Sequence, residues 1–226
     1  MKLKLVGSLL LICFGFNNCQ NNTGPSKDPE ENRFYSGYRN IYRSYGKVPL
    51  DSTKNQLNEY LHEFPESADG WGFLGSIQFL EKDYDASRLS YHKAIKLNRW
   101  KSSFYSSLGT TYSALGMIDS SKTYFMNALA LQDSTAENYF NLALLYSKEG
   151  DTRNSQLYAD SALLKKDIPI SNLLGLSLVY SKNGNAPISK ELIERTIQMG
   201  FTDTLEFSKV LKEEMKLEEF YRNNRF

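Results

Sequence analysis

The feature that most constrains this chain of 226 residues is an internal repeat with a spacing of 34 residues. Three blocks, which begin at Ala68, Ser102 and Ala136, align with one another without gaps. The aligned columns hold an aromatic residue, a leucine, a small residue, a second-helix packing residue and an alanine. They are Trp71, Tyr105 and Tyr139; Leu74, Leu108 and Leu142; Gly75, Gly109 and Ala143; Tyr91, Phe125 and Ala159; and Ala94, Ala128 and Ala162. Units of this length bury their apolar faces by stacking on one another.

Each block predicts a pair of helices. In the middle block, Tyr105, Leu108 and Tyr112 recur at intervals of three and four residues and form one apolar face of a helix. Gly116 follows, where a residue that can adopt the left-handed conformation is expected to end the helix. In the second helix, Ala128 is small enough to let the two helices approach closely.

This pattern resembles the tetratricopeptide repeat family, whose units carry an aromatic residue, a Leu-Gly pair and another aromatic residue before a second helix with small and aromatic positions. The resemblance implies an all-α fold, a right-handed α-solenoid of stacked antiparallel helix pairs with a C-terminal capping helix. Full repeats are expected over residues 68–101, 102–135 and 136–169. Lys82 departs from the pattern, because the other blocks have glycine at the equivalent position.

Weaker copies of the pattern flank the three blocks. A fourth repeat is expected over residues 170–203, and a degenerate leading repeat is expected over residues 34–67. Over residues 204–226 apolar and charged residues alternate, as in a helix that closes the open end of a stack.

The N-terminal segment is typical of a secreted, lipid-anchored protein. A basic start precedes an apolar run from Leu5 to Phe16 that is too short to span a bilayer. Residues 1–18 resemble the signal peptide of a bacterial lipoprotein, with Cys19 as the residue that would carry the lipid; ordinary signal cleavage and an uncleaved anchor are the alternatives. Residues 19–33 are polar and are expected to form a flexible tether. The expected location is the cell envelope, on the periplasmic side or at the surface of a bacterial membrane.

Residues 70–75, GWGFLG, match the letters of a dinucleotide-binding motif. The motif has its physical meaning only after a buried strand, and the polar residues that precede it here do not predict one. Trp71 and Gly75 belong instead to the first-helix pattern of a repeat. We interpret Gly70 and Gly72 as coincidental, and nucleotide binding as disfavoured.

Residue types and charge indicate no catalytic site. The chain has 27 Lys and Arg residues against 26 Asp and Glu residues, which suggests neither a nucleic-acid partner nor an anionic-membrane partner. His62 and His92 stand alone, without the spacing of metal ligands, and both cysteines, Cys13 and Cys19, lie near the N-terminus. We therefore expect no enzyme activity, no cofactor, no metal and no small-molecule substrate.

The resemblance implies a concave surface, lined by the first helices, that binds another protein. By the pattern of the family, the lining positions are Asp69, Gly72, Ser76, Phe79, Ser103, Ser106, Thr110, Ser113, Phe140, Leu144, Ser147, Lys148, Leu174, Leu178, Ser181 and Lys182. The apolar members Phe140, Leu144, Leu174 and Leu178 are expected to form a strip for an extended or helical segment of the partner.

The expected function is that of a non-catalytic, membrane-tethered scaffold that binds a partner protein on its concave face. In architecture it resembles pilus pilotins and envelope-assembly factors with such repeats. One alternative is a self-associating structural scaffold of an envelope assembly. A nucleotide-dependent enzyme, suggested by residues 70–75 alone, is the other alternative and the disfavoured one.

Overall fold

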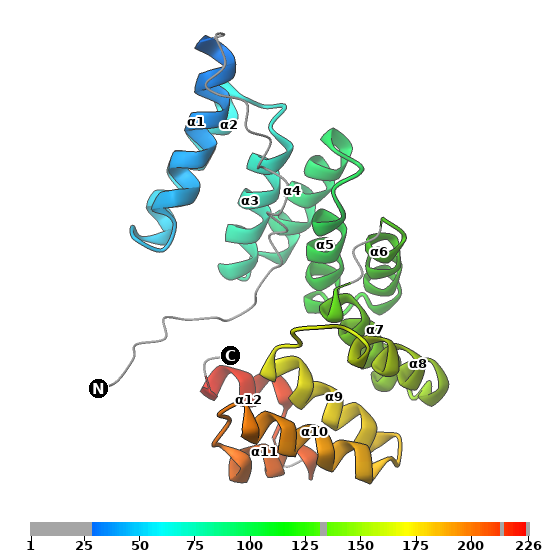
Figure 1. The fold of residues 1–226 in the computed structure, drawn as a ribbon. Coiled ribbons are helices and arrows are strands. Elements are labelled where there is room, and N and C mark those ends of the chain that lie inside the picture. Colours follow the sequence, from blue (N-terminus) through cyan, green and yellow to red (C-terminus); the bar gives the residue numbers. More distant parts are fainter. Residues whose placement is uncertain (1–28, 132–134, 213–214, 225–226) are drawn as a thin grey trace, which may run out of the picture. The chain divides into compact units, whose positions relative to one another are not determined.

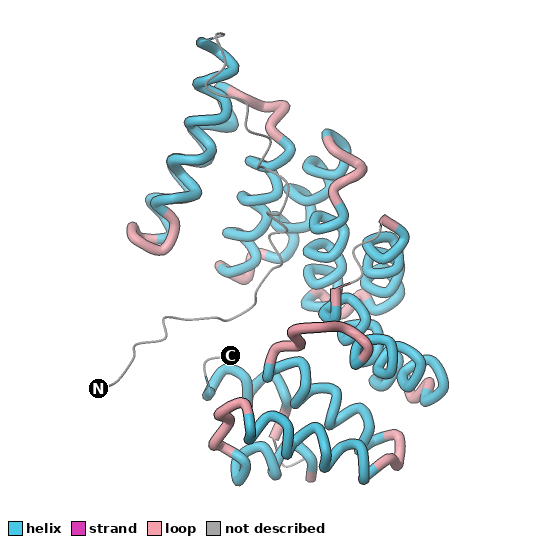
Figure 2. The backbone as a smooth tube through the Cα atoms, viewed as in Figure 1, coloured by secondary structure: helices cyan, strands magenta, loops and turns pink. Residues whose placement is uncertain are grey.

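The computed structural model describes residues 29–131, 135–212 and 215–224, which form α-helices and no β-strand (Figures 1 and 2). The chain divides into two compact units, called here the N-terminal unit and the C-terminal unit. The N-terminal unit contains α1 (Pro29–Ser44), α2 (Leu50–Glu63), α3 (Ala68–Leu80), α4 (Tyr84–Leu97), α5 (Ser102–Ala114) and α6 (Ile118–Ala130). The C-terminal unit contains α7 (Ala136–Glu149), α8 (Thr152–Leu163), α9 (Ile170–Lys182), α10 (Ala186–Gln198), α11 (Thr204–Leu211) and α12 (Leu217–Asn224).

Consecutive helices pack against each other in pairs. In the N-terminal unit the pairs are α1 with α2, α3 with α4 and α5 with α6, and in the C-terminal unit they are α7 with α8 and α9 with α10. Neighbouring pairs then stack, because α3 and α4 pack against α5, and α7 and α8 pack against α9. The prediction of an all-α solenoid built from helix pairs is confirmed. Within these described ranges, no helix is long and apolar enough to cross a membrane.

The two ends of the chain differ from the sequence-based expectation. α1 begins at Pro29, so residues 29–33 of the predicted tether are helical; the remainder of the tether and Cys19 lie outside the described residues. In place of one capping helix over residues 204–226, the structure has the two short helices α11 and α12. The break between them lets Phe207 and Phe220 pack on each other, with ring centroids 5.1 Å apart, in one apolar cluster.

The turn inside each hairpin places one residue in the left-handed conformation. The angle φ is positive at Gly116, Gly150 and Gly184. At the first of these turns, two backbone N–H groups reach back to carbonyls of the preceding helix at 2.9 and 3.0 Å, which satisfies groups that a helix end would leave unpaired. Lys82 adopts the same conformation, with φ of 65°, although it has a Cβ atom.

Within a hairpin, a small residue of the first helix lies under an aromatic ring of the second. A Cβ atom added at Gly109 would lie 3.0 Å from the ring of Phe125, and one added at Gly75 would lie 3.0 Å from the ring of Tyr91. Real Cβ atoms rarely keep such a short distance, so these two positions require glycine for the observed approach. The leucine beside the glycine, such as Leu108, is fully buried.

A buried serine occupies the same position on the second helix of each full repeat. Ser87, Ser121 and Ser155 donate their hydroxyl hydrogens to the backbone carbonyls of Gly75, Gly109 and Ala143, at 2.8, 2.7 and 3.1 Å. The family pattern has alanine at this position. Each serine adds a hydrogen bond between the two helices of its hairpin without adding bulk at their contact.

We predict that Lys82→Gly raises the free energy of unfolding by about 0.5–1 kcal/mol. Glycine removes a left-handed strain of about 1–2 kcal/mol, part of which is offset by the greater freedom of glycine in the unfolded chain. Urea denaturation followed by circular dichroism measures the change. The reverse replacement, Gly116→Lys, should lower the free energy of unfolding. An increase in both variants would contradict this account of the turn.

Candidate partner-binding surface

One face of α5 carries a row of hydroxyl groups that remain partly exposed. The row consists of Ser103, Ser106, Thr110 and Ser113. Their intervals of three and four residues place them on the same side of the helix. Because α5 contains no charged residue, this hydroxyl row offers hydrogen-bond donors and acceptors without a net charge.

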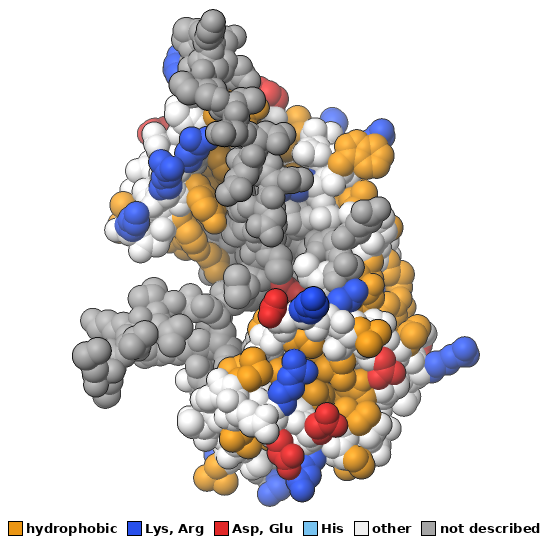
Figure 3. Space-filling view, viewed as in Figure 1, with side chains coloured by type: hydrophobic (Ala, Val, Ile, Leu, Met, Phe, Trp, Pro, Cys, Tyr) orange, Lys and Arg blue, Asp and Glu red, His pale blue; other side chains and the backbone are white. Residues whose placement is uncertain are grey.

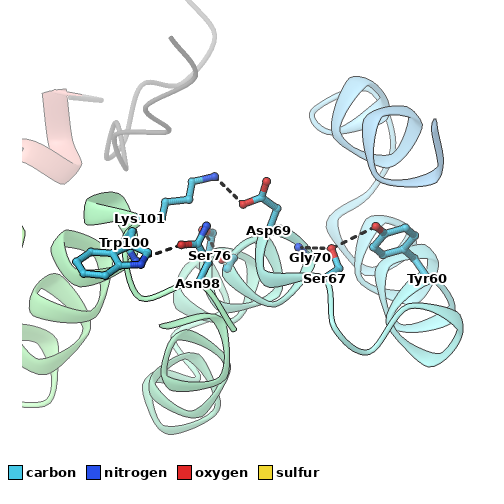
Figure 4. A network of polar contacts seen from close by, with 9 residues as sticks. Tyr60, Ser67, Asp69, Gly70, Ser76, Asn98, Trp100 and Lys101 are labelled. Atoms are coloured by element: carbon cyan, nitrogen blue, oxygen red, sulfur yellow. Dashed lines mark hydrogen bonds and ion pairs between the residues drawn. The ribbon is translucent and has the colours of Figure 1, made fainter. Parts of the chain in front are cut away.

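An ion pair fixes the start of α5 relative to α3. The Lys101 ammonium lies 2.6 Å from a carboxylate oxygen of Asp69 (Figure 4). It also lies 5.1 Å from the centre of the Phe104 ring. Asp69 was predicted to line the groove, but its carboxylate is paired with this lysine. The ion pair joins the first helices of two neighbouring repeats and limits the charge next to the hydroxyl row.

The other predicted positions on α3 pack inside the N-terminal unit. Ser76 is buried; its hydroxyl bonds to the Gly72 carbonyl at 3.1 Å and to the Tyr91 hydroxyl at 2.8 Å. Burial also raises the pKa of Tyr91 to about 12, so this phenol stays neutral. Phe79 is buried too, with its ring centroid 5.2 Å from that of Tyr84. These residues are therefore not part of the candidate surface.

The three glycines of residues 70–75 are packing positions toward three different helices. A Cβ atom at Gly70 would lie 2.7 Å from a methyl carbon of Leu61 on α2, and one at Gly72 would overlap with the Phe104 ring of α5. Gly75 faces α4, as described above. Gly70 and Gly72 are therefore not coincidental, because each lets α3 meet a neighbouring helix. They belong to helix packing rather than to a phosphate-binding loop.

In the C-terminal unit, the chain itself covers most of the predicted apolar strip. Leu174 and Leu178 on α9 are buried in a cluster with the C-terminal residues Phe201, Phe207, Val210 and Phe220. Phe140 is buried in the core between α7 and α9, and Leu144 is partly buried against it. The prediction that Leu174 and Leu178 face a partner does not fit this structure, because α11 and α12 occupy that face of α9.

The polar positions predicted in this unit lie at the helix ends. Ser147 and Lys148 are in the last turn of α7, and Ser181 and Lys182 are in the last turn of α9. The two serines are partly buried and the two lysines are exposed. They remain candidate contacts at one end of each helix, but the structure links them to no apolar groove.

His92 takes part in an aromatic cluster between helices of the first two full repeats. Its Nε2 atom lies 2.9 Å from the Tyr112 hydroxyl, and the rings of Tyr112 and Tyr124 stack with centroids 5.2 Å apart. Burial, aided by the positive charge of Arg88, lowers the pKa of His92 below its usual value. His62 is exposed in the last turn of α2. In the part of the chain that the structure describes, no group of three His, Cys, Asp or Glu side chains could hold a metal ion.

Sequence reasoning missed a surface at the turn between α4 and α5. Trp100 is 69% exposed there, beside the exposed side chains of Leu97 and Arg99. A signal was present in the sequence, because no Asp or Glu occurs between Asp85 and Asp119. The nearly balanced charge of the whole chain hid this local excess of Lys and Arg.

The packing defines the protein as an α-solenoid of stacked helix hairpins. A family model described as "Tetratricopeptide repeat" matches residues 68–99, 102–135 and 136–164. This matched part of the chain consists of tetratricopeptide repeats. Repeats of this family serve in general as non-catalytic modules that bind other proteins, so the protein is by class a scaffold for protein–protein interaction.

Solved structures of other repeat proteins share the fold. PilF of Pseudomonas aeruginosa has a TM-score of 0.68 at 15% identity, over 80% of this chain and 82% of that chain. A tetratricopeptide repeat protein from Parabacteroides merdae has a TM-score of 0.64 at 17% identity, over 79% of this chain and 72% of that chain. YrrB, described as a TPR protein with an unusual peptide-binding site, has a TM-score of 0.59 at 15% identity, over 78% of this chain and 92% of that chain. Comparison of the sequence with curated proteins finds no match.

We predict that Gly72→Ala lowers the free energy of unfolding by about 1–3 kcal/mol, because its Cβ atom would overlap with the Phe104 ring. The same replacement should cost less in a Phe104→Leu chain, where the ring is gone. Urea denaturation of the parent, both single variants and the double variant measures this coupling. Equal losses of unfolding free energy in the two backgrounds would contradict the packing role of Gly72. A rise in the melting temperature of the parent chain with added nucleotide would support nucleotide binding instead.

Proposed function

We propose that this protein is a membrane-tethered scaffold that holds a segment of a partner protein along the hydroxyl row of α5. The observation that carries the proposal is the row itself: Ser103, Ser106, Thr110 and Ser113 stay partly exposed on one face of a first helix. First helices are the ones that line the binding surface in this family. The repeat class supplies the expectation of a protein partner, and YrrB is a solenoid of this fold described with a peptide-binding site.

The chemistry of the hydroxyl row suits an uncharged stretch of polypeptide. Serine and threonine hydroxyls can donate to carbonyls and accept from N–H groups of an extended backbone. Thr110 already donates to the Ser106 carbonyl at 3.2 Å, which leaves its oxygen as an acceptor for a partner. A charged partner segment would find no opposite charge on α5, so the row favours a neutral, polar segment.

The membrane tether is the second part of the proposal. It rests on the sequence of residues 1–18 and on Cys19, which lie outside the described residues. A lipid on Cys19 would place the helical units close to a membrane without a membrane-spanning helix in the described chain. Incorporation of labelled palmitate, lost in Cys19→Ala, tests this part separately.

The partner-binding part is tested with a photo-crosslinking amino acid placed in the full chain in its native cells. We expect Ser106 and Thr110, replaced one at a time, to give the same partner adduct. A probe at Asn127, which is exposed on α6, is the matched control and should not give this adduct. Adducts that are identical at all three positions, or that contain only a second copy of this chain, would contradict the proposal.

A pair of arginine variants supplies the functional test. Thr110→Arg should lower the yield of the partner adduct formed from Ser106 by about tenfold, because it puts a long charged side chain across the hydroxyl row. Asn127→Arg adds the same side chain elsewhere and should leave the yield unchanged. Melting curves of both variants must match the parent for the comparison to hold, and an unchanged yield in Thr110→Arg would overturn the assignment to α5.

A further inference from the structure

A basic and apolar surface lies on α4 and on the turn that follows it. Its exposed members are Leu89, Lys93, Lys96, Leu97, Arg99 and Trp100, and we call it the α4 ridge. The four residues on the helix recur at intervals that place them on one face. Figure 3 shows a hydrophobic side chain with Lys or Arg side chains beside it at the turn that leads into α5.

The apolar members of the ridge are large and well exposed. Trp100 is 69% exposed, Leu89 is 62% exposed and Leu97 is 40% exposed. Ile168, which stands two repeats later at the position equivalent to Trp100, is only 2% exposed. The chain buries the apolar residue of that later turn, whereas it leaves Trp100 exposed. Asn98 holds the turn, since its side-chain oxygen accepts from the Trp100 backbone N–H at 3.1 Å (Figure 4).

The charge of the ridge is positive and largely uncompensated by nearby acids. α5 has no charged residue, and the Asp69 carboxylate of α3 is paired with Lys101. Asp85 of α4 is paired with Arg88, at 3.2 Å. Two of the three cations of the ridge lie on aromatic rings: Arg99 lies 4.6 Å from the centre of the Trp100 ring, and Lys93 lies 4.7 Å from the centre of the Trp71 ring.

We propose that the α4 ridge rests on an anionic lipid surface. Tryptophan prefers the interface between lipid and water, leucine side chains enter the acyl boundary, and Lys and Arg attract anionic headgroups. An acidic protein segment would also match the charge, but it would not require an exposed indole and two exposed leucines in the same ridge. A purely structural role explains only part of the ridge. A cation near a helix C-terminus is favourable, which explains why a lysine occurs at position 96, but it does not explain why Leu89 and Trp100 are exposed.

The ridge supplies a second membrane contact beside the proposed lipid anchor. A basic patch adds electrostatic attraction to anionic lipids to the affinity that a lipid anchor provides. The inference rests on the membrane location in the proposed function, but it does not use the hydroxyl row. A chain without a lipid on Cys19 should still place Trp100 at an anionic surface, so the two ideas can fail separately.

Trp100 itself provides the readout for the test. The chain has two tryptophans, so the full chain with Trp71→Phe carries Trp100 as its only one. We expect its fluorescence to shift to shorter wavelength and to be quenched by brominated lipid on vesicles that contain phosphatidylglycerol, but not on phosphatidylcholine alone. In a chain that also carries Lys93→Glu and Lys96→Glu, binding to the anionic vesicles should weaken by about tenfold or more, and the shift should be lost.

Controls keep the result interpretable. Trp100→Phe leaves Trp71, whose ring lies under Lys93 and whose indole N–H donates to the Pro65 carbonyl at 2.8 Å; brominated lipid should quench its emission much less than that of Trp100. If Trp71→Phe prevents folding, the unmodified chain should show the shift and Trp100→Phe should lack it. Equal responses on neutral and anionic vesicles, or no response on either, would overturn the inference. A response to polyglutamate without one to vesicles would also overturn it and assign the ridge to an acidic protein.

Discussion

The structure depends on the close approach of the two helices within each hairpin. At Gly109 the first helix has no side chain, so the ring of Phe125 lies directly against its backbone. Ser121 adds a hydrogen bond of 2.7 Å to the carbonyl of that glycine. The same approach recurs at Gly75 under Tyr91, and the fixed geometry of each hairpin allows the next one to stack on it. This contact therefore sets the positions of the side chains that the helices expose to other molecules.

The seam between neighbouring hairpins is partly polar, which distinguishes this protein from a solenoid held by apolar contacts alone. Ser87, besides bonding to its own hairpin, lies 3.3 Å from the Thr111 hydroxyl of the next repeat. In the C-terminal unit, Asn183 donates to Ser155 at 3.4 Å across the equivalent seam. Buried polar groups stabilise a structure when each has a hydrogen-bond partner. An arrangement in which the partners separate costs free energy, because buried polar groups are then left unpaired. These serines therefore favour one stacking geometry within each unit.

The hairpins could be predicted because the signals that encode them are local. The position of Gly109 on the apolar face of its own helix is visible in the periodicity of a single repeat. The role of Gly72 could not be predicted, since its neighbour Phe104 comes from the next repeat and the contact depends on how the hairpins are rotated. The family pattern likewise placed Leu178 on a binding face, but it carried no information on the C-terminal helices, where Phe207 covers that face. Local packing was predictable; the surface left for a partner was not.

The most direct test of the central contact is the stability of Ser121→Ala. Alanine is the residue that the family pattern has at this position, so the variant removes the hydroxyl without disturbing the fit of the helices. Urea denaturation should show a loss of about 1 kcal/mol, because the hydrogen bond to the Gly109 carbonyl disappears. The adjacent, partly buried Ser120, replaced by alanine, should change stability by less than about 0.5 kcal/mol. Equal stabilities of the two variants would contradict the claim that this serine helps to hold the hairpin together.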